Sequence, residues 1–271
     1  MSMPFYVPPE QVMKDRADFA RKGIARGRSV IVLGYDKGIA FVAENPSRAL
    51  HKVSEIYDRI AFAAVGRYNE FESLRVAGIR YADLRGYSYD RTDVTARALA
   101  NTYAQTLGAV FTQESKPFEI EIVVAEVGLT SEEDQIFRLT YDGSVADEQG
   151  FVAMGGASEI AEERLGAAWR PGLSLAESLQ LAVDVLAASG DNGERREIGA
   201  AQLEVAVLDR ERPRRTFRRV IGPLLTDLLS HDNPMADAPS ADESHPGHPE
   251  VLSGDSEDDG TGASNDPGPS L

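Results

Sequence analysis

The chain has 271 residues and a formal net charge of −16, and hydrophobic residues make up 42% of it. This length suits one large domain or two small ones, and no run of about 18 apolar residues predicts a membrane span. Cysteine is absent, which excludes disulfides and thiolate metal sites. With no signal-peptide pattern at the start, these features favour a cytoplasmic location.

The negative charge is concentrated at the end of the chain. Residues 231–271 contain ten acidic residues and no Lys or Arg, so only six net negative charges remain for the first 230 residues. This stretch is rich in Pro, Gly, Ser and Asp and has few large apolar residues, which predicts a disordered acidic tail. The predicted folded domain therefore covers residues 10–230, after a short apolar, proline-containing segment at 1–9.

The first half of the folded part predicts a helix, two strand pairs and two long helices. Pro9 suits the first turn of the first helix, and Gly27 suits its end. A turn at Asp36-Lys37-Gly38 predicts a hairpin. We expect Asn69 to cap the second helix, with Glu72 reaching back to it. The expected ranges are helix 10–26, strands 30–33, 39–42, 52–57 and 59–65, and helices from 69 and over 92–112.

The second half repeats this order of strands followed by helices. Gly155-Gly156 predicts a tight turn into a helix, and Ser174 with Glu177 forms a capping-box pattern. The expected strands are 118–127, 135–140, 144–154 and 203–208, the helices are 158–169 and one from 174, and a last strand and short helix end near 229. Strands grouped as hairpins and helices grouped in pairs predict an α+β fold of four layers, with two antiparallel sheets between two helix layers.

Catalytic and metal-binding chemistry has little support in the sequence. Three of the four histidines lie in the predicted tail, and His51 has no Gly-x-Ser-x-Gly motif to accompany it, so we interpret it as a loop histidine. A zinc site is disfavoured because cysteine is absent and His51 is the one histidine in the predicted folded part. Gly155-Gly156 lacks the Gly-Lys-Ser/Thr ending of a phosphate-binding loop. We therefore predict no catalytic residue, no metal and no cofactor.

Two charged clusters receive structural interpretations. Arg214-Arg215 and Arg218-Arg219 surround Phe217, and a subunit interface is favoured over a nucleic-acid patch because they form no long basic stripe. The run Glu132-Glu133-Asp134 has no calcium-loop spacing and is interpreted as a solvated turn.

Eight segments along the chain, taken in order, form a distinctive set. They are Asp18-Phe19-Ala20-Arg21 with Gly27, 42–48 with Lys52, 57–59, 103–118, Met154-Gly155-Gly156, 173–182, 204–209 and Phe217-Arg218-Arg219. Together they resemble bacterial (actinobacterial-type) 20S proteasome α subunits over about residues 1–220, and their order and spacing are more specific than any one of them.

The resemblance implies a four-layer αββα sandwich of the N-terminal-nucleophile hydrolase superfamily. It implies heptameric α rings that cap two rings of β subunits, an AAA ATPase activator as partner, and protein substrates in transit. In this superfamily the nucleophile is the first residue of a processed chain, and its free amine is the base. The corresponding strand begins here near Ser29, after a helix that belongs to the fold, so the resemblance implies a non-catalytic subunit.

Two groups of site residues follow from the resemblance. Lys52 and Gly27 match the pocket between neighbouring α subunits that receives the C-terminal carboxylate of the activator, for which a lysine ammonium is a suitable point charge. Residues 1–9 match the gate, whose members would be Met3, Pro4, Phe5, Tyr6, Val7, Pro8 and Pro9. Archaeal and eukaryotic gates carry Tyr-Asp-Arg near the N-terminus, whereas the two such triplets here begin at Tyr57 and Tyr89, inside the fold.

Two other functions remain open from the sequence. A self-processing hydrolase of the same superfamily would require cleavage just before Ser29 or a nearby residue. A stand-alone binding protein would be a monomer that does not assemble with β subunits. The residues do not encode the substrates, their tag, or the role of the acidic tail.

Overall fold

Two five-stranded sheets, antiparallel throughout, form the centre of the protein. The structure is a computed structural model that describes residues 8–188 and 195–230. The predicted gate residues Met3–Val7 and the acidic segment 231–271 lie outside the described residues. One sheet has the order β10-β9-β2-β1-β8, with β1 (Val30–Tyr35), β2 (Gly38–Glu44), β8 (Phe151–Met154), β9 (Leu203–Asp209) and β10 (Phe217–Val220). The other has the order β3-β4-β5-β6-β7, with β3 (Val53–Tyr57), β4 (Ile60–Gly66), β5 (Ile120–Glu126), β6 (Gln135–Leu139) and β7 (Val145–Asp147).

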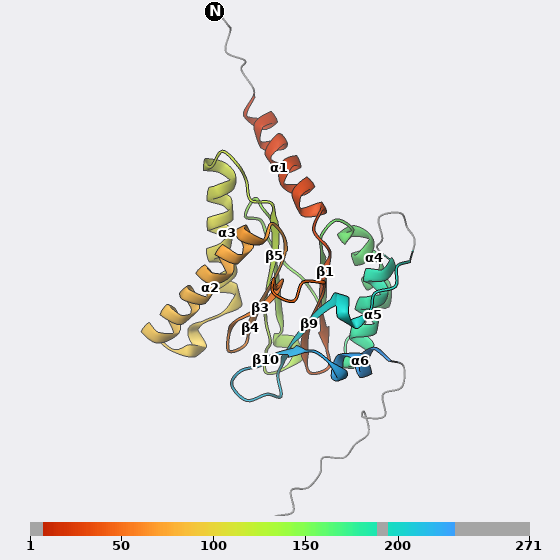
Figure 1. Ribbon diagram of the computed structural model, residues 1–271. Coiled ribbons are helices and arrows are strands. Elements are labelled where there is room, and N and C mark those ends of the chain that lie inside the picture. The colour runs from red at the N-terminus through yellow and green to blue at the C-terminus, as the bar shows by residue number, and fades with distance from the viewer. Residues whose placement is uncertain (1–7, 189–194, 231–271) are drawn as a thin grey trace, which may run out of the picture. The chain divides into compact units, whose positions relative to one another are not determined.

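Helices cover the outer faces of both sheets. In Figure 1, α2 and α3 lie beside the sheet that contains β3, β4 and β5, and α4 and α5 lie beside the sheet that contains β1 and β9. The helices are α1 (Pro9–Ala25), α2 (Tyr68–Ser88), α3 (Ala96–Gln113), α4 (Ser158–Ala168), α5 (Leu175–Ala188) and α6 (Pro223–Leu229). Three short 3-10 helices are η1 (Arg91–Asp93), η2 (Ser131–Glu133) and η3 (Ala200–Gln202). The predicted αββα sandwich of the α+β class is therefore confirmed.

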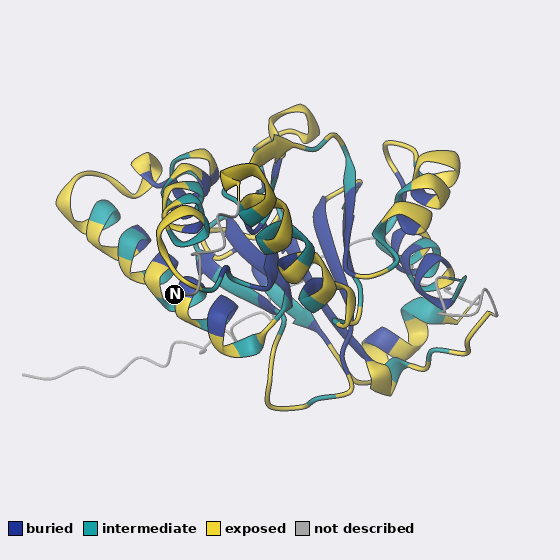
Figure 2. Cartoon of the chain, turned by 90° about the horizontal axis from the view of Figure 1, so that it is seen from above, coloured by how far each residue is buried: buried dark blue, intermediate teal, exposed yellow. Residues whose placement is uncertain are grey.

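Each sheet is buried on both faces, because successive side chains of a strand point to opposite sides. In β1, Val30 and Val32 enter the core between the two sheets, whereas Ile31 and Leu33 enter the core beneath α4 and α5. A third core lies between α2, α3 and the outer face of the other sheet. Figure 2 shows the strands as a dark, buried centre and the outer surfaces of the helices as exposed. Because both faces of each sheet are buried, most strands are apolar at nearly every position.

Helix α1 is part of the domain core. It packs against β4 and β5, and its Ala20 and Ile24 are buried in the core between the sheets. Pro8 is its N-cap residue and Pro9 lies in its first turn, where a missing N–H removes no helical hydrogen bond. The predicted position of Pro9 is thus confirmed.

Three predicted details of the elements are wrong. Helix α2 begins at Tyr68, after Arg67, with no side-chain cap, and the predicted partner Glu72 instead forms an ion pair with Arg75 at 2.5 Å. The predicted helix 92–112 is divided, since Thr95 caps α3 and η1 precedes it. The predicted strand 144–154 is two strands, β7 and β8, which belong to different sheets.

Candidate functional site

The two predicted pocket residues lie close together in the structure. Gly27 follows α1, and Lys52 immediately precedes β3. The Nζ atom of Lys52 donates a hydrogen bond of 2.6 Å to the carbonyl oxygen of Arg28, the residue after Gly27. The main-chain N–H of Lys52 donates a second hydrogen bond, to Oε2 of Glu204 at 2.8 Å. Both the backbone and the amine of Lys52 are therefore fixed.

Glycine at position 27 allows the chain to leave α1 close to β4. Its N–H donates to the carbonyl oxygen of Ile24 at 2.8 Å. A Cβ atom added here would lie 2.6 Å from Cγ1 of Val65 and 3.2 Å from the N atom of Gly66. Any larger residue would displace the segment whose carbonyl holds Lys52.

Gly155-Gly156 pack against the same segment from the other side. Gly155 has a φ of +113°, and a Cβ added at Gly156 would lie 2.4 Å from the carbonyl oxygen of Ala25. The pair forms the turn between β8 and α4, which confirms the predicted strand-to-helix turn. It positions the chain that leads to Ser29.

A buried carboxylate, Glu204 on β9, organises the floor of the pocket. Its side chain is 6% exposed. Five donors surround it: Asn45 Nδ2 (2.7 Å), His51 Nδ1 (3.1 Å), the N–H groups of Lys52 (2.8 Å) and Val53 (3.3 Å), and Arg219 Nη1 (2.7 Å). Burial raises the pKa of Glu204, but the hydrogen bonds from Asn45, Lys52 and Arg219 outweigh burial and hold this pKa below its ordinary range. Glu204 is therefore a fixed anion that ties β9 and β10 to the start of β3.

A second buried carboxylate, Glu44 at the end of β2, lies nearby. It accepts from Nη1 of Arg28 at 2.7 Å and from both terminal nitrogens of Arg196 at 3.1 and 3.0 Å. Its side chain is 5% exposed, whereas those of Arg28 and Arg196 are 50% and 44% exposed. The two anions of the site are thus buried, whereas Arg28 and Arg196 are about half exposed.

The ammonium of Lys52 has an unusual balance of charges. Burial lowers its pKa to about 8, although Glu44 and Glu204 act in the opposite direction; Arg28 lowers the pKa further. Most of the amine is still protonated at neutral pH, and the ammonium fraction falls as the pH rises through about 8. Chemically, the site offers one ammonium and a surrounding rim of guanidinium groups to a small anion such as a carboxylate.

Ser29 lies beside this site but is embedded in the chain. Its carbonyl oxygen accepts a hydrogen bond of 3.2 Å from the N–H of Glu44, and α1 precedes it as part of the core. Its nitrogen is a peptide amide and not the free amine that would serve as base in an N-terminal nucleophile. His51, the candidate base, lies outside the strands and is paired with Glu204. Within 8–188 and 195–230, no group of His, Asp and Glu is arranged to hold a metal ion.

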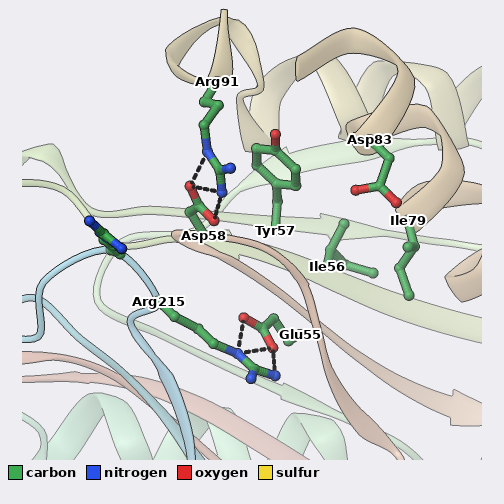
Figure 3. A pocket seen from close by; sticks show the side chains of 9 residues that line it. Glu55, Ile56, Tyr57, Asp58, Ile79, Asp83, Arg91 and Arg215 are labelled. Carbon is green, nitrogen blue, oxygen red and sulfur yellow. Dashed lines mark hydrogen bonds and ion pairs between the residues drawn. The ribbon is translucent and has the colours of Figure 1, made fainter. Parts of the chain in front are cut away.

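A groove of about 800 Å³ opens at the other end of β3. Both Tyr-Asp-Arg triplets reach it, because Arg91 forms an ion pair with Asp58 at 2.5 Å and lies over the ring of Tyr57 (Figure 3). Arg215 pairs with Glu55 across the groove. The two triplets thus bind each other within the fold.

The charged clusters found in the sequence are mostly paired within the chain. Arg215, Arg218 and Arg219 have the carboxylate partners Glu55, Asp209 and Glu204, and Arg214 adopts a positive φ of 68° in the loop before β10. The prediction of a solvated turn is wrong for Asp134. Its side chain is 14% exposed and forms an ion pair with Arg210 at 2.8 Å.

Sequence reasoning missed the two buried carboxylates. Glu44 and Glu204 lie in strands whose other residues are almost all buried and apolar. A single charged residue in such a strand indicates a buried partner, and this signal could have identified both. Their arginine partners, Arg28, Arg196 and Arg219, are distant in the sequence and could not be assigned from it.

Known proteins resemble the chain over the whole domain. A family model described as proteasome subunit matches residues 24–208. "Proteasome subunit alpha" of Sanguibacter keddieii is 72% identical over 230 residues, which are 85% of this chain and 90% of the relative. The protein of the same name from Xylanimonas cellulosilytica is 72% identical over 83% of this chain and 95% of the relative, and that from Kineococcus radiotolerans is 68% identical over 85% and 99%.

The helices give one further finding: in the described part of the chain, none is both long and apolar enough to cross a membrane. The family match spans well over half of the sequence and includes Gly27, Glu44, Lys52 and Glu204, and the relatives named above are all α subunits. This chain belongs to the proteasome family, among its bacterial α subunits.

Proposed function

We propose that this chain is a non-catalytic subunit of the outer rings of a 20S proteasome core. In this role it forms heptameric rings, attaches to β subunits that carry the proteolysis, gates substrate entry, and docks the C-termini of an AAA ATPase activator. The observation that carries the proposal is the cluster of charges at Lys52, where one amine lies close to three arginines that are bonded to two buried carboxylates. A cytoplasmic location remains a prediction.

The chemistry of the pocket supports docking of a carboxylate. Glu44 and Glu204 already accept hydrogen bonds from arginines, so they leave Lys52 available to a ligand. The rim formed by Arg28, His51 and Arg196 is close to half exposed. A C-terminal carboxylate is a small anion that such a site would recognise.

The absence of catalysis is supported by the connection between α1 and β1. Because α1 is buried at Ala20 and Ile24, removal of residues 1–28 would expose the core between the sheets. Cleavage that produces a free amine at Ser29 would therefore destabilise the fold, which disfavours the self-processing alternative.

The gate is proposed at residues 1–9, which precede or begin α1. Seven short apolar segments on a ring axis could fill the entrance by contact with one another. We expect deletion of residues 2–8 to raise the turnover of a small fluorogenic peptide by the assembled particle several-fold, since passage would no longer require displacement of the segments. Steady-state hydrolysis at equal particle concentration measures this effect, and unchanged turnover would count against gating.

The tip of α2 is proposed as a surface for the β subunit. Leu84, Tyr87 and Tyr89, at the C-terminal end of α2, are 69%, 91% and 74% exposed, and Asp83, which precedes Leu84, lines the groove of Figure 3. Clusters of exposed large apolar side chains on soluble proteins are typical of contact surfaces. We expect the double substitution Leu84→Ser, Tyr87→Ser to reduce attachment of β subunits at least tenfold, without unfolding the chain.

The matched control for this surface is Ile160→Ser, which removes a 51% exposed apolar side chain from α4, on the other helix layer. Native mass spectrometry of co-expressed subunits separates the outcomes. Retained α rings without β subunits support the assignment. Loss of the α ring itself would instead place the tip of α2 between α subunits.

A further inference from the structure

The groove at the end of β3 is held in shape by contacts within the chain. Arg215 pairs with Glu55 on one wall and Arg91 pairs with Asp58 on another (Figure 3). The N–H of Thr216 donates a hydrogen bond of 2.9 Å to the carbonyl oxygen of Asp58. These contacts fix η1 and the loop before β10 on β3, so the groove is preformed, as ligand-binding sites usually are.

Apolar side chains form part of the groove. Ile56 is buried, and Ile79 and Tyr57 are half-buried. Helix α2 lies against the ring of Tyr57, because a Cβ atom added at Gly86 would lie 2.1 Å from Oη of Tyr57. A partner could therefore bury an apolar side chain here without a rearrangement of the helix.

Two charged side chains of the groove have no partner in the chain. Asp83 and Arg214 form no ion pair and no side-chain hydrogen bond within residues 8–188 and 195–230, and Asp83 acts on Arg91 through longer-range attraction alone. Arg214 is also the one non-glycine residue of these ranges with a positive φ, 68°, a conformation that is costly for a residue with a Cβ atom and that clusters at functional sites. The groove thus presents one free anion and one free cation.

The composition of the groove fits a polypeptide better than a small molecule. Six of its nine lining residues are charged, whereas small-molecule pockets are mostly apolar. Beside it, Leu84 and Tyr87 follow Asp83 on α2 and are 69% and 91% exposed. Charged groups around an apolar patch with exposed aromatic side chains are typical of protein interfaces.

The groove lies at the end of the domain away from the proposed gate. Lys52 and Asp58 stand at opposite ends of β3, and six residues of extended chain span about 20 Å. In Figure 1, α1 lies at one end of the domain and the loop before β10 at the other. In a ring that admits substrate past residues 1–9, the end opposite α1 would face the inner rings. This step rests on the proposed function.

We propose that the groove receives an extended segment of the β subunit that carries three kinds of side chain. A lysine or arginine of this segment pairs with Asp83, an acidic side chain pairs with Arg214, and an apolar side chain between them packs on Ile56 and Ile79. Complementary charges fix the register of an interface and exclude wrong partners. Asp83 and Arg214 therefore determine which segment is accepted, whereas Leu84 and Tyr87 contribute apolar area.

The test reverses each free charge separately, in the full chain co-expressed with the β subunit of its organism. Asp83→Lys and Arg214→Glu place a like charge opposite the partner's side chain, which is strongly unfavourable. We expect each to reduce the number of β subunits attached to α rings at least tenfold, as measured by native mass spectrometry. Because neither residue has a partner within the chain, thermal unfolding of the chain should be unchanged.

The matched control is Glu163→Lys, which reverses an exposed carboxylate on α4 and should leave attachment intact. Arg214→Gly separates charge from backbone strain: it relieves the positive φ, so the chain should keep its stability while attachment still weakens several-fold. Attachment of the unmodified chain should also weaken between about 50 and about 500 mM salt, and that of Asp83→Lys should not weaken further.

Each outcome of the co-expression experiment decides a different point. Full attachment of β subunits in both Asp83→Lys and Arg214→Glu overturns the assignment of the groove and leaves the outer-ring function standing. Loss of the α ring itself in these variants also overturns it, because the groove would then lie between α subunits. If the unmodified chain forms no complex with β subunits, the proposed function fails, and the assignment of the groove fails with it.

Discussion

Replacement of Lys52 by Ala is expected to abolish the stimulation of protein degradation by the activator ATPase. The substitution removes the ammonium at the centre of the pocket and leaves the ligand carboxylate facing only the arginines of the rim. Truncating one partner of a hydrogen-bonded charge pair typically costs about 2 kcal/mol or more, which is roughly a 30-fold loss of affinity. Degradation of a folded substrate with ATP and the activator measures this effect.

The control for this substitution is Lys37→Ala, which removes a half-exposed lysine of the β1–β2 turn that pairs with Glu211. It should leave stimulated degradation unchanged. Small-peptide hydrolysis by the assembled particle should be intact in both variants, because it needs no activator. Protein degradation at the full rate in Lys52→Ala particles would show that the pocket is assigned wrongly.

The pocket also predicts a dependence of docking on pH. The pKa of Lys52 lies at about 8, so its charge is largely present at pH 7 and largely absent above pH 9. Docking of a carboxylate should weaken across this range.

Replacement of Glu204 by Ala should destabilise the chain by about 3–5 kcal/mol, as is typical when one partner of a buried ion pair is removed. The change leaves Arg219 and the N–H groups of Lys52 and Val53 without their acceptor. Chemical denaturation at a fixed protein concentration measures the free energy of unfolding, since assembly makes stability depend on concentration.

Glu211→Ala is the matched control, because it removes an exposed carboxylate whose partner Lys37 is also exposed. Such surface pairs contribute about 0–1 kcal/mol. The pKa of Glu204 is below its ordinary value of 4.5 in the folded state, so its stabilising effect is present above pH 4.5 and is lost as the pH falls through the lowered pKa. A loss under about 1 kcal/mol in Glu204→Ala would contradict its role in holding the pocket floor.

The layers of the fold could be predicted from the sequence because they depend on local patterns. Hairpin turns such as Asp36-Lys37-Gly38 and caps such as Ser174 with Glu177 are formed by residues close in the chain, and the structure contains both: Gly38 pairs with Tyr35, and Ser174 and Glu177 bond reciprocally. Where a local pattern had a competing partner, the prediction was wrong. Glu72 bonds Arg75 one turn later and does not reach back to cap α2.

The remaining features of the fold and the site could not be predicted, because they depend on contacts between residues far apart in the sequence. The strand expected over 144–154 crosses from one sheet to the other, which depends on the partners β6 and β1 and on no feature of the segment alone. The candidate site was found only in part for the same reason. Lys52 and Gly27 came from the resemblance, whereas the contacts of Glu204 with Lys52 and Arg219 join three separate segments.

The central claim is that the intact chain forms the outer rings of a proteasome core. Native mass spectrometry of this chain co-expressed with the β subunit of its organism tests it most directly, with the assembly mass and the subunit mass recorded together. We expect an α7β7β7α7 particle in which this chain retains the residues that precede Ser29. A monomer that ignores β subunits, or a chain trimmed to a new N-terminal nucleophile near Ser29, would contradict it.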